Sequence, residues 1–189
     1  MPEFFEENRA HAARTFGSSA GKPYLRATLS PTYRTPAMFL QALFVVLHVL
    51  MAAAWFGLTL RLGTQTRLLL TLDHDAATTV AENLHRGIRE IGIFLLLTFV
   101  FGLGAFVTGG PANYGPNIHT GMLLVLIMLA LHYLGLRPQW RAMRHALQEH
   151  RTDAAALAQR KISMFTGIGH LLWVTVFILM FWHRLTAGM

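Results

Sequence analysis

The fold is decided by residues 91–136, which read IGIFLLLTFVFGLGAFVTGGPANYGPNIHTGMLLVLIMLALHYLGL and contain no Asp, Glu, Lys or Arg. A transmembrane helix needs about 20 apolar residues, so this stretch is long enough for two of them. Gly109-Gly110-Pro111 and Pro116 interrupt it near its middle, and glycine and proline are the strongest turn signals. The stretch therefore predicts two antiparallel membrane helices joined by a tight, uncharged turn.

Two further uncharged stretches flank this one. Residues 35–60 and 162–183 also lack charged side chains, and each is long enough for one membrane helix. We therefore expect an all-α integral membrane protein in which four transmembrane helices form an up-down bundle. The expected spans are about 37–60, 91–110, 117–136 and 162–184, within a domain of residues 37–189. Residues 1–36 form a polar N-terminal tail without a signal-peptide pattern, and its aromatic residues suggest that it rests on a partner subunit.

Composition places the chain among membrane proteins. Of its 189 residues 53% are hydrophobic and 13% are charged, whereas a soluble domain has about 25% charged residues. The mean hydropathy of +0.42 agrees with this assignment. These values exclude a disordered tail, a nucleic-acid-binding arm and most soluble enzymes. The absence of cysteine excludes disulfides, iron–sulfur clusters and thiolate metal sites.

The basic residues predict an orientation in the membrane. With four spans, the tail, the 111–116 turn and the C-terminus share one side and carry six Lys and Arg, while the loops 61–90 and 137–161 carry ten. Because Lys and Arg are enriched in cytoplasmic loops, we expect both loops in the cytoplasm of a bacterium, with the chain in its inner membrane. Both loops have helical patterns, in which Asp75 is the expected cap and Glu82 the expected partner of Arg86.

Histidine is the unusual residue of this sequence, with 10 His against 9 Asp and Glu together. Five lie in or at the ends of the expected spans: His48, His119, His132, His170 and His183. Ionisable residues at membrane depth are costly and usually functional. No carboxylate accompanies them, which disfavours a proton relay, whereas neutral imidazole is a common metal ligand. We therefore predict one or two haem b groups near these five histidines, with the iron held by His48, His119, His132 or His170.

Depth divides these histidines into two groups. At 1.5 Å per residue, His48, His132 and His170 lie near mid-membrane, and His119 and His183 lie near the outer face. The spacings 119–132 and 170–183 are both thirteen residues, which resembles the ligand layout of di-haem b-type cytochromes. Thirteen steps of 100° leave the two side chains about 140° apart on an ideal helix.

The alternative for any single buried histidine is a structural hydrogen bond to a backbone carbonyl.

Two motifs resemble a known family. Leu43-Phe44-Val45-Val46-Leu47-His48, followed by Trp55-Phe56-Gly57, resembles the first-helix motif of HemJ-type protoporphyrinogen oxidases and CopD-type membrane proteins. In the third span, His119, the Leu/Val run 123–126 and His132 match the HemJ pattern. The resemblance covers about residues 40–135 and implies a four-helix bundle that binds haem b, with His48, His119 and His132 at the matching positions. Gly121 stands where the family carries a lysine, which counts against porphyrinogen oxidation.

Four functions remain open from the sequence. The favoured one is electron transfer through haem b, in a homo-oligomer or as a subunit of a larger membrane complex with an unidentified redox partner. The second is HemJ-like porphyrinogen oxidation, the one alternative that would make the chain an enzyme. The third is CopD-like copper handling by histidines with Met51, Met122 or Met128, which otherwise pack the bundle. The fourth is an accessory membrane subunit without a cofactor.

Overall fold

The computed structural model describes residues 36–186, with the side chains of residue 37 and of residues 183–186 left out. The predicted N-terminal tail lies outside these residues, apart from Pro36. The described part consists of long helices and their short connections, and it contains no strand. The elements are α2 (Pro36–Leu68), α3 (His74–Thr108), the 3-10 turn η1 (Pro111–Asn113), α4 (Pro116–Ala130), the π-helical segment η2 (Leu131–Leu136), α5 (Arg137–Gln148) and α6 (Thr152–Thr186).

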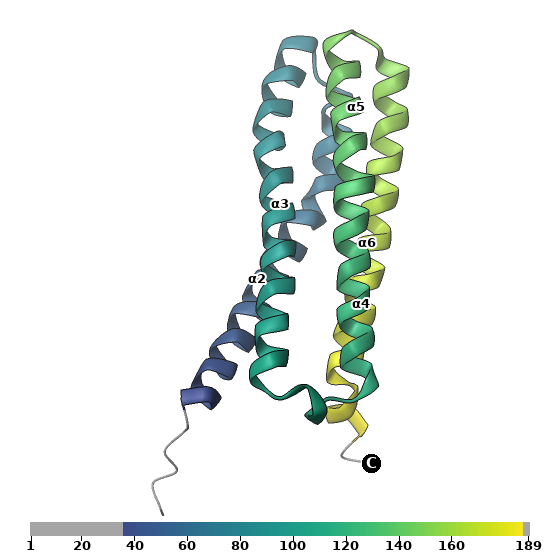
Figure 1. The fold of residues 1–189 in the computed structure, drawn as a ribbon. Helices are drawn as coiled ribbons and strands as arrows, with labels where there is room; N and C mark the ends of the chain where they lie inside the picture. Colours follow the sequence, from purple (N-terminus) through teal and green to yellow (C-terminus); the bar gives the residue numbers. More distant parts are fainter. Residues whose placement is uncertain (1–35, 187–189) are drawn as a thin grey trace, which may run out of the picture. The chain divides into compact units, whose positions relative to one another are not determined.

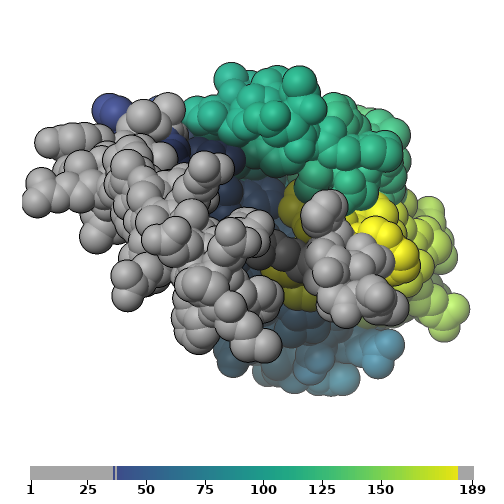
Figure 2. Space-filling model, turned by 90° about the horizontal axis from the view of Figure 1, so that it is seen from below, coloured from purple at the N-terminus to yellow at the C-terminus, as the bar shows by residue number. Residues whose placement is uncertain are grey.

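The helices run alternately up and down (Figure 1). The start of α2, the α3–α4 connection and the end of α6 lie at one end of the bundle, where Figure 2 shows the α3–α4 connection beside α6. Helical segments Met38–Leu68, His74–Thr108, Pro116–Gln148 and Thr152–Trp182 are each long and apolar enough to cross a membrane. The prediction of an all-α, four-helix membrane bundle is confirmed.

Each membrane-crossing helical segment is longer than the span predicted for it, because the charged loops continue the helices. The start of α3 differs from the prediction: Asp73 is the N-cap and accepts the Ala76 N–H at 2.9 Å, while Asp75 lies inside the first turn. Glu82 also differs, since its carboxylate pairs with Arg144 of α5 rather than with Arg86 on its own helix. This ion pair joins two helices outside the uncharged stretches.

Packing between the helices follows a heptad pattern. Along α2 and just past its end the buried side chains are Trp55, Thr59, Leu62, Thr66 and Leu69, which alternate in steps of four and three as in a coiled coil. The hydroxyls of Thr59 and Thr66 donate to the carbonyl oxygens four residues earlier, at 3.0 and 2.9 Å. The polar threonines therefore enter the seam without leaving a donor unpaired.

Burial is deepest beyond the uncharged stretches, at the end that carries the α2–α3 and α5–α6 connections. Leu62, Leu69, Trp140 and Met143 are all at most 1% exposed there. In water the hydrophobic effect drives such packing, whereas lipid tails cover apolar side chains equally well inside a bilayer. No described side chain of α2 before Trp55 is buried. The first half of α2 therefore presents apolar surface outward.

The π-helical turn η2 contains His132. The Arg137 N–H donates to the His132 carbonyl oxygen, five residues earlier. Pro138 explains this wider turn, because proline has no N–H and its ring clashes with the carbonyl four residues before it, that of Leu134. The chain therefore continues from α4 into α5 without a break, through the kind of turn that is frequent at functional sites.

Candidate functional site

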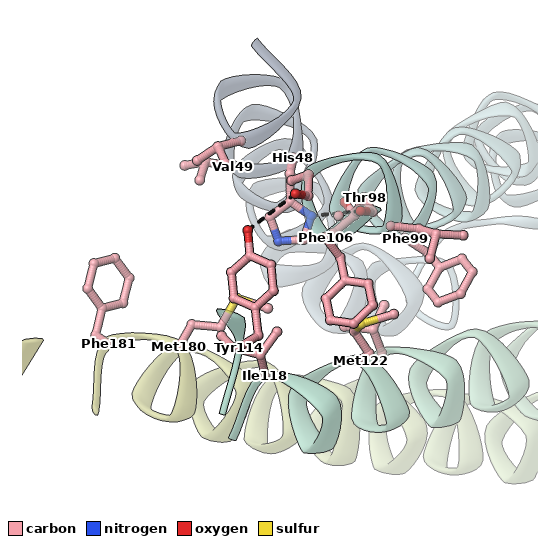
Figure 3. Close-up of a pocket in the computed structure, with 15 residues that line it drawn as sticks. His48, Val49, Thr98, Phe99, Phe106, Tyr114, Ile118, Met122, Met180 and Phe181 are labelled. Atoms are coloured by element: carbon pink, nitrogen blue, oxygen red, sulfur yellow. Dashed lines mark hydrogen bonds between the residues drawn. The ribbon is translucent and has the colours of Figure 1, made fainter. Parts of the chain in front are cut away.

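His48 of α2 faces an apolar cavity of about 250 Å³ between the helices (Figure 3). Its Nδ1 lies 2.7 Å from the Thr98 carbonyl oxygen on α3. A carbonyl oxygen only accepts, so Nδ1 carries the proton and Nε2 of the neutral ring bears a lone pair. Gly102 permits the approach, because a Cβ at that position would lie 2.7 Å from Nδ1. The backbone of α3 therefore fixes both the position and the tautomer of this imidazole.

The other walls of the cavity are nearly all apolar. Phe106 of α3, Met122 of α4 and Met180 of α6 contribute to it, and Figure 3 shows the two methionines on the helices across from His48. Tyr114 also lines it, with its hydroxyl 3.3 Å from the Ala105 carbonyl oxygen. A side chain with a soft thioether sulfur thus stands on each of the two helices that face the imidazole.

The cavity opens sideways, toward the outside of the bundle. Val49, Leu103 and Phe181 all line it and are 56%, 40% and 47% exposed. The first half of α2 is apolar and outward-facing at this level, so lipid tails would surround the opening. A flat, apolar ligand can therefore enter from the bilayer without crossing water.

His132 lies in a different environment, deep inside the bundle. It is 4% exposed, and its Nε2 has no hydrogen-bond partner among the described residues. A Cβ at Gly92 would lie 2.5 Å from this nitrogen. His132 shares a cavity of about 20 Å³ with Trp55, whose buried Nε1 also lacks a partner. That volume admits about one water molecule, so a porphyrin does not fit at His132 in this arrangement.

His170 of α6 makes a hydrogen bond across to α2. Its Nε2 lies 3.0 Å from Thr59 Oγ1, and that hydroxyl donates to the carbonyls of Trp55 and Phe56. With the hydroxyl hydrogen on a carbonyl, Thr59 Oγ1 accepts and His170 Nε2 is the donor. The ring also packs edge-on against Phe56, with centroids 5.3 Å apart. His170 therefore makes a structural contact, although its partner is a side-chain hydroxyl rather than the backbone carbonyl considered for a single buried histidine.

Of the two outer histidines, His119 does not line the His48 cavity. His119 is exposed, with Nδ1 3.2 Å from the Gly115 carbonyl oxygen in its own first turn. Its ring meets the edge of Phe106, with centroids 5.3 Å apart, and Phe106 itself lines the cavity. His183 belongs to the last turns of α6, but its side chain lies outside the described part of the chain.

The structure does not bring His48, His132 and His170 together into one group. Trp55 and Met128 line both the cavity of His132 and a small cavity next to His48, so these two side chains separate the histidines. Within residues 36–182, no three His, Asp or Glu side chains gather where they could hold one metal ion.

A row of aromatic rings connects the His48 cavity with His170, and sequence reasoning missed it. Phe181, which lines the cavity, contacts Phe177 with centroids 4.6 Å apart, and Phe177 stacks on Trp173 at 5.5 Å. Trp173 then stacks on Phe56 at 4.3 Å, beside His170. The sequence contains one sign of this row. Trp173, Phe177 and Phe181 are spaced four residues apart along α6, which places their side chains on one helix face.

The arrangement around His48 has a definite chemical capacity. An oriented imidazole lone pair and two thioethers surround an apolar cavity, which is a donor set for a haem iron or a soft metal ion. Thr98 and Met180 belong to this site and were not expected from the sequence, because helix rotation cannot be inferred from uniformly apolar spans. Comparison of the chain with family models, with curated proteins and with solved structures found no match.

Proposed function

We propose that this chain binds haem b beside His48 and serves in electron transfer in the membrane. The hydrogen bond between His48 Nδ1 and the Thr98 carbonyl oxygen carries the proposal, since it leaves the Nε2 lone pair facing an apolar cavity. Histidines that bind metals almost always donate their other ring N–H to a carbonyl, a carboxylate or water. When bound, haem b supplies reversible one-electron chemistry, and the protein supplies ligation and a low dielectric.

The residues around the cavity fit such a group. Its walls are aliphatic and aromatic, it opens toward the bilayer, and Gly102 leaves room for the imidazole. Met122 and Met180 offer thioethers opposite His48, and a histidine–methionine pair is a known axial set in cytochromes. The cavity of about 250 Å³ does not enclose a whole macrocycle, so the remainder would face lipid or a second protein surface.

The aromatic row supports electron transfer in particular. It runs from Phe181 in the cavity to Phe56, which is partly buried against the core, with every centroid separation at or below 5.5 Å. Aromatic contacts of this kind also add to helix packing. Their continuity with the His48 cavity gives a chain of closely spaced π systems between a proposed redox centre and the bundle interior.

Spectroscopy of the purified protein tests the proposal. We expect a red protein whose reduced spectrum shows the α-band of haem b, and we expect His48→Ala to lose it. His145→Ala is the matched control, because His145 is exposed and lies outside the cavity. Haem spectra that persist in His48→Ala would assign the ligand elsewhere. Intact spectra in single alanine variants of all five span histidines would overturn histidine ligation.

Copper handling is the second candidate, on the observation that His48 shares its cavity with Met122 and Met180. One imidazole and two thioethers suit Cu(I). Copper handling would be favoured over haem binding if the purified protein is colourless and retains one copper per chain. The copper should then be lost in Met180→Leu but not in Met51→Leu. No charged side chain of the described residues lines the cavity to hold porphyrinogen carboxylates, so no observation favours porphyrinogen oxidation.

We further propose that the connections α2–α3 and α5–α6 face the cytoplasm of a bacterial inner membrane, and that the chain works in a homo-oligomer or a larger complex. The excess of Lys and Arg in these loops supports the orientation. Since the sequence has no cysteine, single cysteines report sidedness cleanly. A membrane-impermeant maleimide should label Asn113→Cys in intact spheroplasts and Thr71→Cys only after lysis. The opposite pattern would reverse the orientation.

A further inference from the structure

A cationic cavity lies between α3 and α5, away from the His48 site. It has a volume of about 250 Å³ and is lined by His85, Ile88, Arg89, Arg137, Trp140 and Arg141. We propose that it binds the phosphate headgroup of an anionic phospholipid. The inference depends on neither haem nor copper.

Three arginines line the cavity, and no Asp or Glu of the described residues lines it with them. Arg89, Arg137 and Arg141 form no ion pair in the described part of the chain, where the ion-paired arginines are Arg144 and Arg151. Like charges around one cavity repel each other, so a bound anion stabilises the arrangement. Guanidinium groups also match phosphate oxygens in bidentate geometry. The charge and the donors of the cavity therefore select a phosphate.

Neighbouring side chains hold the donors in place. The Arg137 guanidinium lies 5.2 Å from the Tyr133 ring centroid, a cation–π contact that orients the group. Trp140 Nε1 donates to His85 Nδ1 at 3.2 Å. The neutral His85 ring therefore keeps its proton on Nε2, which adds a further donor beside the arginines.

The position of the cavity distinguishes a lipid from a free anion. Arg89 and Arg137 flank the uncharged residues 91–136 on neighbouring antiparallel helices, at the depth where hydrocarbon gives way to headgroups. Ile88 and Trp140 line the cavity beside the arginines. A phospholipid brings both a phosphate and apolar chains to such a site, and basic pockets between membrane helices are known to bind lipid headgroups.

Native mass spectrometry tests this with phosphatidylglycerol and phosphatidylcholine of identical acyl chains, offered in equal amounts. We expect the wild type to retain phosphatidylglycerol preferentially. Arg89→Gln, Arg137→Gln and Arg141→Gln should each reduce that preference by about fivefold, the effect of one basic residue near a membrane surface. Arg160→Gln is the matched control, since Arg160 is exposed on α6 and does not line the cavity.

The outcomes separate the alternatives. The proposal is overturned if the three cavity variants prefer phosphatidylglycerol as strongly as Arg160→Gln does. Displacement of bound phosphatidylglycerol by millimolar inorganic phosphate would assign the site to a free anion and overturn the lipid assignment. Arg137→Lys keeps the charge but loses the planar fork, so it should retain an intermediate preference even if a glutamine variant fails to fold. Unchanged haem or copper content in folded variants keeps this result independent of the proposed function.

Discussion

His132 and Gly92 face each other so closely that α3 has no room for a side chain there. A Cβ at Gly92 would lie 2.5 Å from His132 Nε2 and 3.3 Å from the Tyr133 hydroxyl oxygen. The ring cannot easily retreat, because His132 is 4% exposed and sits in the π-helical turn that joins α4 to α5. This contact therefore sets the approach of α3 to the third membrane helix.

Gly92→Ala should destabilise the bundle. Forcing a methyl group into such a contact costs about 1–3 kcal/mol, measurable as a lower midpoint of thermal unfolding in detergent. Gly167→Ala is the control, since a Cβ at Gly167 meets nothing within 4 Å. That variant should be neutral, or gain up to about 1 kcal/mol from helix propensity. Equal midpoints for the two variants would contradict the close contact.

Gly102→Ala should weaken the proposed cofactor site without removing a ligand. The new methyl group displaces the His48 ring from the Thr98 carbonyl oxygen, and loss of such a supporting hydrogen bond typically costs about 10–100-fold in metal affinity. Titration of the purified protein with haem measures the change. Gly57→Ala, also without a neighbour within 4 Å, should bind as the wild type. If the two variants bind haem with equal affinity, the hydrogen bond from His48 to Thr98 does not support the site.

The π-helical turn should tolerate the loss of one residue. It contains one residue more than an α-helical turn would need, and Leu134 within it is 79% exposed. Because Pro138 favours the wider turn, deleting Leu134 in a Pro138→Ala background should yield a continuous α-helix with both flanks still facing the core. Deleting Ile127, which is 41% exposed but lies in regular α-helix, rotates all following residues by about 100°. Size-exclusion chromatography should recover folded protein for the first deletion and aggregate for the second.

Two buried tryptophans should respond differently to loss of the indole N–H. Trp55 is 5% exposed and its Nε1 has no described partner, whereas Trp140 is 1% exposed and donates to His85. Trp140→Phe should therefore cost about 1 kcal/mol more than Trp55→Phe, because it breaks a hydrogen bond. Chemical unfolding of the two variants measures the difference. A larger loss for Trp55→Phe would show that its N–H has a partner in the native protein.

The number and the order of the membrane helices were predictable from the uncharged stretches alone. Charged residues cannot be placed cheaply in hydrocarbon, so the uncharged stretches mark the spans, and Gly109-Gly110-Pro111 marks the reversal between the second and third. The helical extensions were also readable from their amphipathic pattern. Asp73 rather than Asp75 caps α3, because capping depends on the local backbone conformation and both residues carry the required carboxylate.

What each histidine faces depends on how the helices are rotated in the folded bundle. Depth along a helix follows from residue number, but rotation about the axis does not, because every face of a uniformly apolar span is equally suited to lipid. The fold turns His48 to a lateral cavity, His132 to Gly92 and His170 to Thr59. Three histidines at similar depth therefore occupy three environments. The physical reason is that close contacts at glycines and threonines, rather than hydrophobicity, fix helix rotation inside a bilayer.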